Sequence, residues 1–290
     1  MHYPVMLREA LERLAIRPDG IYLDATVGLG GHTAEIARRL AGGWVLANDR
    51  DAESIELARA NTAEWADRIR FHQGDFFGLR EALAMHGVER VDGLLADLGV
   101  SRYQLTTPAR GLSILSDGPL DMRLDRNQEL TAADLINHGA EKQLADWIYQ
   151  YGEERRARKL ARAIVRARPI RSTAHLAGVL EKAVPRTGKL HPATRVFMAL
   201  RIVVNDELEQ LDELLRVAPD LTRAGGRVVV ISFHSLEDRK VKERFRELGR
   251  EGRALILTKK PETPSWEELR ENPPSRSAKF RAIEILDAAA

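Results

Sequence analysis

The stretch that decides the fold is IYLDATVGLGGH, residues 21–32. An apolar run ends at Asp24, and three glycines follow at Gly28, Gly30 and Gly31. Apolar residues at helical spacing come next, so the order predicts a strand, a tight turn and a helix. Many α/β folds hold a nucleotide-like cofactor on such a turn.

The alternation of strand and helix signals continues from this stretch to residue 100. Repeated units of a strand followed by a helix predict a parallel sheet with helices on both faces. Right-handed crossovers make such a sheet doubly wound. Strands are expected at 20–26, 43–49, 69–75 and 90–100, and helices at 32–41, 51–65 and 76–87.

Beyond residue 100 the pattern changes to helical periodicity. Residues 131–184 hold four candidate helices, and one long helix is expected over 191–218. The α/β pattern then returns, with a helix end, a Gly-Gly turn and a buried strand over 221–233 and closing strands at 254–260 and 277–286. The sequence therefore predicts an α/β domain made of 1–104 and 196–290, interrupted by an all-helical insertion at 105–195.

The composition excludes several kinds of protein. The 290 residues are 44% hydrophobic and 30% charged, which fits a soluble globular chain. No run approaches 18 apolar residues, so the sequence predicts no membrane span. It also predicts no secretory signal, and a cytoplasmic location is the simplest interpretation. The absence of cysteine excludes disulfides, thiolate zinc sites and cysteine nucleophiles. Because His32, His191 and His234 are widely dispersed, no metal site is predicted.

The glycine turn discriminates between cofactor classes. A P-loop requires a lysine that GLGGHT lacks, and Thr33 stands where a dinucleotide fingerprint has its third glycine. A carboxylate at Asp24 suits a cationic ligand group, such as an α-ammonium, better than a pyrophosphate. Asp49 ends the second strand, where an acid accepts hydrogen bonds from ribose hydroxyls. An NAD-dependent oxidoreductase is therefore disfavoured but stays a rival interpretation.

Further strand ends strengthen this interpretation. Asp75 and Phe76 follow the third strand, in position to contact an adenine amino group and ring. Together with Asp24, the glycines and Asp49, they look like an S-adenosylmethionine methyltransferase. Asp97 ends the fourth strand and would face the methyl donor. A carboxylate there can hydrogen-bond a target amine and help to take its proton, or it can contact the cofactor alone.

Longer motifs then resemble one family along essentially the whole chain. These are DLGVS (97–101), DGPLDMR (117–123), YGEER (151–155), HPATR (191–195) and ISFHSLEDR (231–239). In this order they resemble the bacterial small-subunit (16S) ribosomal RNA cytosine-N4 methyltransferase family.

The resemblance implies a Rossmann-like class I S-adenosylmethionine methyltransferase fold with an inserted helical domain. It implies methylation of the exocyclic N4 of a specific cytidine in the decoding region of 16S ribosomal RNA. The partner is then the small ribosomal subunit, and a homodimer stays open. Its cofactor contacts, carried over by motif, are Gly30, Gly31, His32, Asp49, Phe76, Asp97 and Gln104.

Two further segments are candidates for RNA contact. Residues 155–171 hold eight basic residues and no acidic one. Arg158 and Arg162 lie at helical spacing on one side, which suits phosphate contacts, although a solvated face is the alternative. His234 and Ser235 follow the fifth strand, where a substrate base would approach. Ser235 is alternatively a helix N-cap, with Asp238 completing a capping box.

Two other functions remain as rivals at this point. One is a methyltransferase that acts on another nucleic acid or on a small amine, against which only the resemblance argues. The other is a non-catalytic RNA-binding protein on a degenerate methyltransferase fold, which the intact cofactor residues disfavour.

Overall fold

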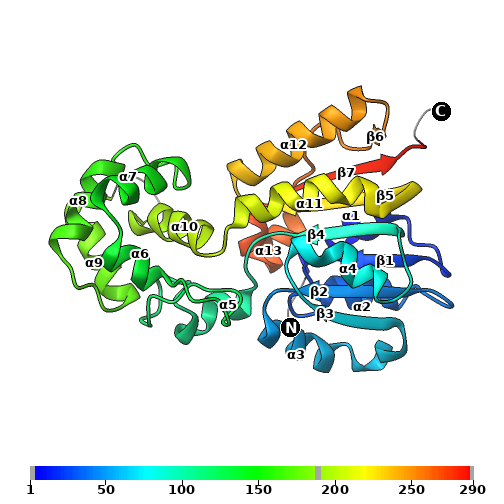
Figure 1. The fold of residues 1–290 in the computed structure, drawn as a ribbon, viewed down its shortest axis with the longest axis horizontal. Coiled ribbons are helices and arrows are strands. Elements are labelled where there is room, and N and C mark those ends of the chain that lie inside the picture. The colour runs from blue at the N-terminus through cyan, green and yellow to red at the C-terminus, as the bar shows by residue number, and fades with distance from the viewer. Residues whose placement is uncertain (1–3, 187–190, 288–290) are drawn as a thin grey trace. The chain divides into compact units, whose positions relative to one another are not determined.

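The computed structural model describes residues 4–186 and 191–287. The chain divides into two compact units, one formed by Met1–Gly99 with Leu208–Ala290 and the other by Val100–Glu207 (Figure 1). These bounds differ from the predicted insertion at 105–195. Val100 and the helix at 193–204 pack into the core of the helical unit, so the segments that contain them belong to that unit.

A seven-stranded sheet forms the centre of the first unit. Its strand order is β3-β2-β1-β4-β5-β7-β6. The first five strands are parallel, and β7 runs antiparallel to both of its neighbours. The strands are β1 (Ile21–Asp24), β2 (Trp44–Asp49), β3 (Ile69–Gln73), β4 (Val91–Asp97), β5 (Thr222–Ser232), β6 (Ala254–Ile256) and β7 (Lys279–Ile285).

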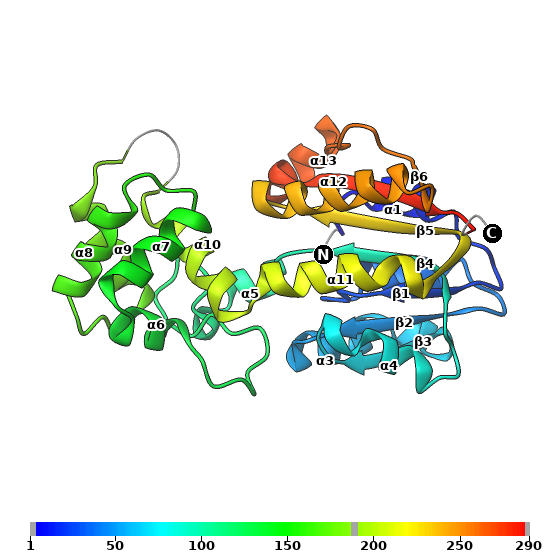
Figure 2. The same cartoon turned by 45° about the horizontal axis from the view of Figure 1, so that its top comes forward.

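Helices cover both faces of this sheet, which confirms the predicted α/β fold (Figure 2). Apolar side chains of α4 (Leu79–Ala84), α11 (Glu207–Leu221) and α12 (Ser235–Arg250) form the core on one face. Those of α1 (Leu7–Leu14), α2 (Gly31–Ala37) and α3 (Ala52–Asn61) form the core on the other. The first unit thus has three layers, with the carboxyl ends of its parallel strands at one edge.

The predicted single helix over 191–218 is wrong. The structure has α10 (Ala193–Val204) and α11, separated by Asn205 and Asp206. Asp206 adopts a left-handed backbone with φ of 49°, which a continuing α-helix does not tolerate. The buried Asn205 side chain is also committed elsewhere, because it accepts from the Leu124 N–H and donates to the Met122 carbonyl. The sequence predicted one helix because both segments have an apolar face, so the helical periodicity of apolar residues continues across the break.

Other predicted boundaries also moved. The Gly-Gly turn after residue 221 lies inside β5, where the pairing with β4 is irregular and Gly225 has φ of 75°. The helix predicted over 76–87 begins as a 3₁₀ turn, Phe76–Gly78, before α4. A further helix, α13 (Trp266–Glu271), lies in a segment where none was expected.

The helical unit has its own apolar core. Within it, Arg123 pairs through two nitrogens with the Asp121 carboxylate, and this pair anchors the DGPLDMR loop. In the part of the chain that the structure describes, no helix is long and apolar enough to cross a membrane. The helices are α5 (Arg102–Thr106), α6 (Ala132–His138), α7 (Glu141–Gln150), α8 (Ala157–Arg166), α9 (Thr173–Ala183) and α10.

Candidate functional site

The glycine turn between β1 and α2 has the geometry that the sequence predicts. Gly28 and Gly30 have φ of 51° and 85°, a region that favours glycine. A Cβ on Gly30 would lie 2.7 Å from the Thr62 side chain, so a larger residue would clash with the end of α3. The Gly28 N–H donates to Asp49 Oδ2 at 2.9 Å. The turn is therefore tied directly to the end of β2.

Three carboxylates lie at the carboxyl ends of the adjacent strands β2, β1 and β4. They are Asp49, Asp24 and Asp97, each the last residue of its strand. Asp24 is fully buried and accepts from the Thr33 hydroxyl at 2.6 Å. Because parallel strands end at the same edge, the sequence prediction that these acids share one edge is met in the geometry.

The electrostatics of this edge are unusual. Burial raises the pKa of Asp24 to about 6 and that of Asp49 to about 6. Burial, followed by the charges of Asp24, Glu237 and Glu268, raises the pKa of Asp97 well above its ordinary value. Among the described residues, no lysine or arginine pairs with any of the three strand-end acids. Within the part of the chain that the structure describes, this edge is therefore electronegative.

His32 faces Asp97 across this edge. Its Nε2 lies 3.0 Å from the Val5 carbonyl, which can only accept, so the neutral ring carries its proton at Nε2. Its Nδ1 lies 3.8 Å from Asp97 Oδ2. Asp97 Oδ1 is buried and has no hydrogen-bond partner within residues 4–186 and 191–287. One oxygen of Asp97 is thus left for a bound molecule.

Asp75 and Phe76 lie directly after β3, and a residue that sequence reasoning missed holds them. Gln210 of α11 donates to Asp75 Oδ2 at 3.0 Å and accepts from the Phe76 N–H at 3.0 Å. The other oxygen of Asp75 accepts from the Phe77 N–H. Asp75 therefore caps its own turn. No local signal could reveal Gln210, because it lies 135 residues from Asp75.

Gln104 belongs to the helical unit, although the predicted boundary placed it in the α/β domain. It is buried in α5, where its side chain accepts from the Ser101 N–H and the Ser101 hydroxyl accepts from the Gln104 N–H. These reciprocal bonds form a capping box at the start of α5.

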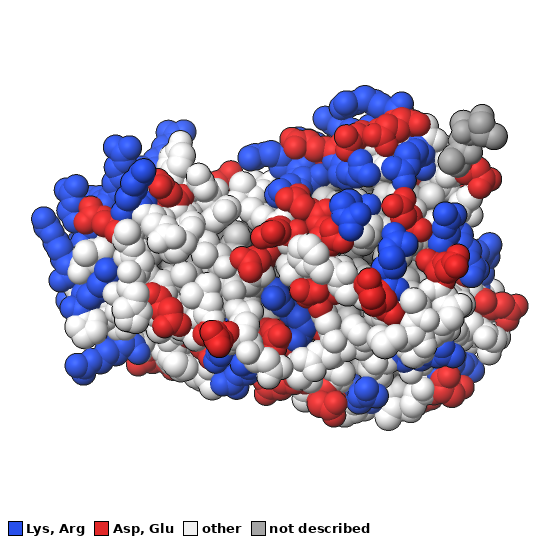
Figure 3. Space-filling view, in the orientation of Figure 1, with Lys and Arg blue, Asp and Glu red and all other residues white. Residues whose placement is uncertain are grey.

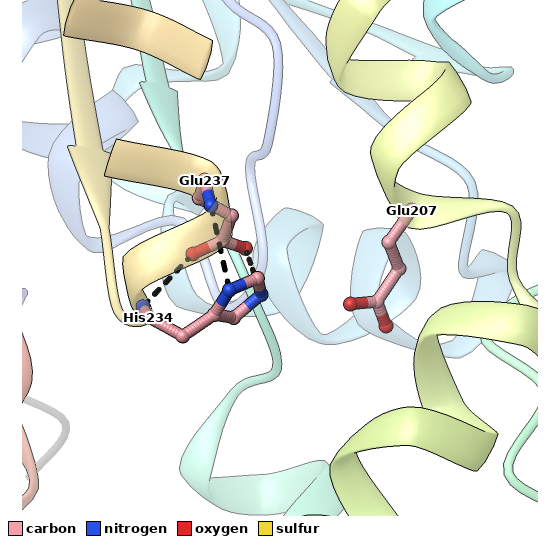
Figure 4. Close-up of side chains that lie close together, drawn as sticks. All are labelled: Glu207, His234 and Glu237. Atoms are coloured by element: carbon pink, nitrogen blue, oxygen red, sulfur yellow. Dashed lines mark hydrogen bonds and ion pairs between the residues drawn. The ribbon is translucent and has the colours of Figure 1, made fainter. Parts of the chain in front are cut away.

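His234 caps α12, which corrects the predicted alternative of a Ser235 cap with Asp238. The capping box pairs His234 with Glu237, and Ser235 is the first helical residue (Figure 4). The Glu237 N–H donates to His234 Nδ1, and Nε2 lies 3.2 Å from Glu237 Oε1. Asp238 instead pairs with Arg281. Both ring nitrogens of His234 thus face Glu237, which gives the ring a structural role. Figure 4 also draws Glu207, which pairs with Arg201 in the helical unit.

The basic residues of α8 lie on one side of that helix. Arg158, Lys159, Arg162 and Arg166 are exposed, whereas Leu160 and Ile164 are buried. Only Arg162 has an ion pair among the described residues, a long contact of 3.4 Å with the exposed Glu141. Figure 3 shows Lys and Arg side chains gathered over α8 at the left edge. Arg158, Lys159 and Arg166 are therefore cations of this helix that no described acid neutralises.

Comparisons with known proteins agree with this geometry. The sequence profile of the MraW methylase family matches residues 1–286. Proteins named ribosomal RNA small subunit methyltransferase H are 65% identical in Solibacter usitatus and 50% identical in Acidobacterium capsulatum. These alignments cover 98% of this chain in both cases, and 100% and 98% of those relatives.

A crystal structure from Clostridium thermocellum is similar with a TM-score of 0.51 over 99% of this chain and 100% of that one. Since only 11% of the aligned residues are identical, this likeness concerns the fold alone. Membership is decided by the full-length profile match and by the sequence identities. On these grounds the chain belongs to the MraW methylase family.

Proposed function

We propose that the protein transfers a methyl group from S-adenosylmethionine to the exocyclic N4 of a specific cytidine in the decoding region of 16S ribosomal RNA. The observation that carries the proposal is the edge formed by β1, β2 and β4. Three carboxylates meet there, one buried and two partly buried, beside a glycine turn at a helix start, and no lysine or arginine of the described residues pairs with them. The names of the relatives supply the RNA, and the resemblance supplies the target atom.

The chemistry of this edge suits S-adenosylmethionine. The cofactor carries a sulfonium and an α-ammonium, and a cation favours the ionised form of a nearby carboxylate. We assign Asp24 to the cationic end of the cofactor and Asp49 to its ribose hydroxyls. The backbone of Gly30, Gly31 and His32 contacts the amino acid portion. Phe76 contacts the adenine ring, and Asp75 stays a candidate for the adenine amino group. Gln104 remains a proposed cofactor contact, carried over from the family resemblance.

Asp97 is the proposed catalytic residue. When bound, S-adenosylmethionine supplies an electrophilic methyl group on its sulfur. Cytosine N4 is a weak nucleophile because its lone pair is delocalised into the ring. A carboxylate at Asp97 accepts a hydrogen bond from that amine, draws the lone pair out of conjugation and helps to take the N4 proton. The Asp97 N–H donates to the Thr26 hydroxyl at 2.7 Å, which fixes the end of β4.

The target base has to be accessible before this chemistry can occur. N4 lies on the Watson–Crick edge, so a paired cytidine must be unpaired or flipped out. Phosphate contacts by Arg158 and Arg162 on α8 supply affinity without reading sequence. His234 and Ser235 stay candidates for substrate contact, since the buried Nε2 of His234 lies beside Glu237 but makes no hydrogen bond among the described residues.

One experiment tests both reaction and target. Small ribosomal subunits from cells that lack this protein are incubated with the purified protein and methyl-labelled S-adenosylmethionine, and the RNA is digested for mass mapping. We expect N4-methylcytidine at a single position in the decoding region. Label on another nucleoside, or only on DNA or small amines, would contradict the proposal. Calorimetry with NAD in parallel tests the oxidoreductase alternative, for which we expect no binding.

The cellular setting follows from the substrate. Bacterial subunits are assembled in the cytoplasm, so we place the activity there. The sequence left a homodimer open, and sedimentation equilibrium of the purified protein distinguishes a dimer from a monomer.

A further inference from the structure

A cavity of about 200 Å³ lies in the first unit, away from the strand ends that hold the three acids. The second half of α12, the strand β6 and the residues after it form its walls. Phe245 and Ile256 give it an apolar lining, and Lys242, Arg246 and Lys259 surround it with positive charge. Arg281 of β7 also reaches it, and no carboxylate is among its described lining residues.

The cations of this region fall into two groups according to their partners. Lys240 on α12 pairs with Asp212 at 2.6 Å, and Arg244 pairs with Glu247 at 2.5 Å. Arg281 is buried and pairs with Asp238 at 2.7 Å. In these three ion pairs each cation is compensated by an acid.

The remaining cations of the cavity lack such compensation. Lys242, Arg246 and Lys259 make no ion pair within the part of the chain that the structure describes. Arg246 and Lys259 are exposed, and Lys242 is half-buried. Like charges that share one concave surface repel, and a bound anion relieves that repulsion. The cavity therefore has the charge pattern of an anion site.

The cations continue along α12 beyond the cavity. Lys242, Arg246 and Arg250 follow one another at spacings of four residues, so they lie on one side of the helix, where the exposed Glu243 also lies. Figure 3 shows Lys and Arg side chains along α12, with Asp and Glu side chains beside them. A row of cations beside an apolar-floored cavity suits a polymer of phosphates better than a single small anion, because it follows a backbone.

We propose that the cavity between α12 and β6, with the row Lys242–Arg246–Arg250, is a second contact for the ribosomal RNA backbone, made by the methyltransferase unit itself. This inference rests on the proposed function, because it takes ribosomal RNA as the partner. Lys242 and Arg246 bind phosphate oxygens of the RNA. The apolar side chains of Phe245 and Ile256 beneath them exclude water from these cation–phosphate contacts. The site reads no sequence and adds to the affinity that α8 supplies.

The test compares two double variants of the same helix. In Lys242→Ala/Arg246→Ala the uncompensated cations are removed, and in the matched control Lys240→Ala/Arg244→Ala the paired cations are removed. Both variants lose the same charge from α12, so long-range electrostatic effects are equal. Binding to small ribosomal subunits is measured over a series of salt concentrations. We expect the salt slope of log K to fall by about 1.4 to 1.8 in the first variant, since each lost phosphate contact contributes about 0.7 to 0.9.

The control is expected to change that slope by less than half as much. An equal change in both variants, or no change in the first, would overturn the inference. Lys242→Arg/Arg246→Lys keeps the charges and should restore the wild-type slope. Calorimetric binding of S-adenosylmethionine, unchanged in every variant, shows that each one is folded.

Methyl transfer by the wild-type protein separates this inference from the proposed function. If the wild type does not methylate subunit RNA at all, the proposed function fails. If it does, and Lys242→Ala/Arg246→Ala has an unchanged salt slope and an unchanged KM for subunits, only the second contact fails. We expect that variant to raise KM for subunits several-fold with kcat unchanged, because its residues hold RNA and do not touch the reacting atoms.

Discussion

The strand-end acids and the basic helix α8 hold charge in opposite ways. Asp24 is buried and Asp49 and Asp97 are partly buried, and burial raises the pKa of each acid. Arg158 and Arg162 stay exposed, where solvent and salt screen them. The difference teaches what each region can do. Withdrawn acids discriminate a cationic small molecule at short range, whereas exposed cations attract a polyanion at long range without choosing its sequence.

The largest expected effect is at Asp97. Asp97→Asn keeps the shape but removes the proton acceptor, so kcat for methyl transfer should fall by about 100- to 10,000-fold. Single-turnover transfer of a labelled methyl group measures this. The matched control is Asp75→Asn, which also follows a strand but has both oxygens occupied by Phe77 and Gln210. Its effect on kcat should be much smaller. Full kcat in Asp97→Asn would remove Asp97 from the catalytic role.

A second prediction concerns the cost of burying Asp24. Its folded pKa of about 6 exceeds its ordinary value of 3.8. This raised pKa favours folding below about pH 4, and the contribution is lost as pH rises through 6. Without bound cofactor, the Asp24→Asn variant should therefore have a free energy of unfolding at pH 7 that is higher than that of the wild type by about 1–3 kcal/mol. Urea unfolding at pH 4 and pH 7 checks this, since the difference should shrink at pH 4. A destabilised variant at pH 7 would contradict the prediction.

The same acids predict how cofactor affinity depends on pH. A cationic cofactor binds the carboxylate forms of Asp24 and Asp49, and both have a pKa of about 6 in the free protein. Affinity for S-adenosylmethionine should be flat above pH 7 and fall about tenfold per pH unit below pH 6 for each group that must lose its proton. Calorimetry from pH 5 to pH 8 measures the slope, and Asp24→Asn should reduce it. An affinity that is constant over this range would show that neither acid meets the cation.

The smallest effect is expected at α8. Arg158→Ala/Arg162→Ala should weaken binding to small subunits several-fold and lower the salt slope by about 1.4 to 1.8. Arg38→Ala/Arg216→Ala is the matched control, because it removes two exposed arginines that pair with Glu35 and Glu213. If the salt slope of log K is the same in the two variants, the basic side of α8 is only solvent-exposed and does not bind RNA. The pH dependence of cofactor binding should be unchanged in both.

Much of the fold was predictable because its signals are local. The periodicities of strands and helices, and the acids at strand ends, act over a few residues and need no distant partner. Asp24, Asp49 and Asp97 were therefore placed correctly at one edge of the sheet. The break at Asn205 was missed because its cause is the loop at Met122 and Leu124, about eighty residues away in the chain.

The order of β-α units, the glycine turn, the strand-end acids and the one-sided basic helix could be predicted from the sequence alone. Each of these features depends only on residues that are close together in the chain. Side-chain partners were settled only by the folded chain. Gln210 holds Asp75, and Glu237 lies against His234. On α12, Lys240 and Arg244 are paired with acids, whereas Lys242 and Arg246 have no acid partner among the described residues. The physical reason is that a hydrogen bond or ion pair depends on distances of a few ångströms, which chain order does not encode for residues far apart in sequence.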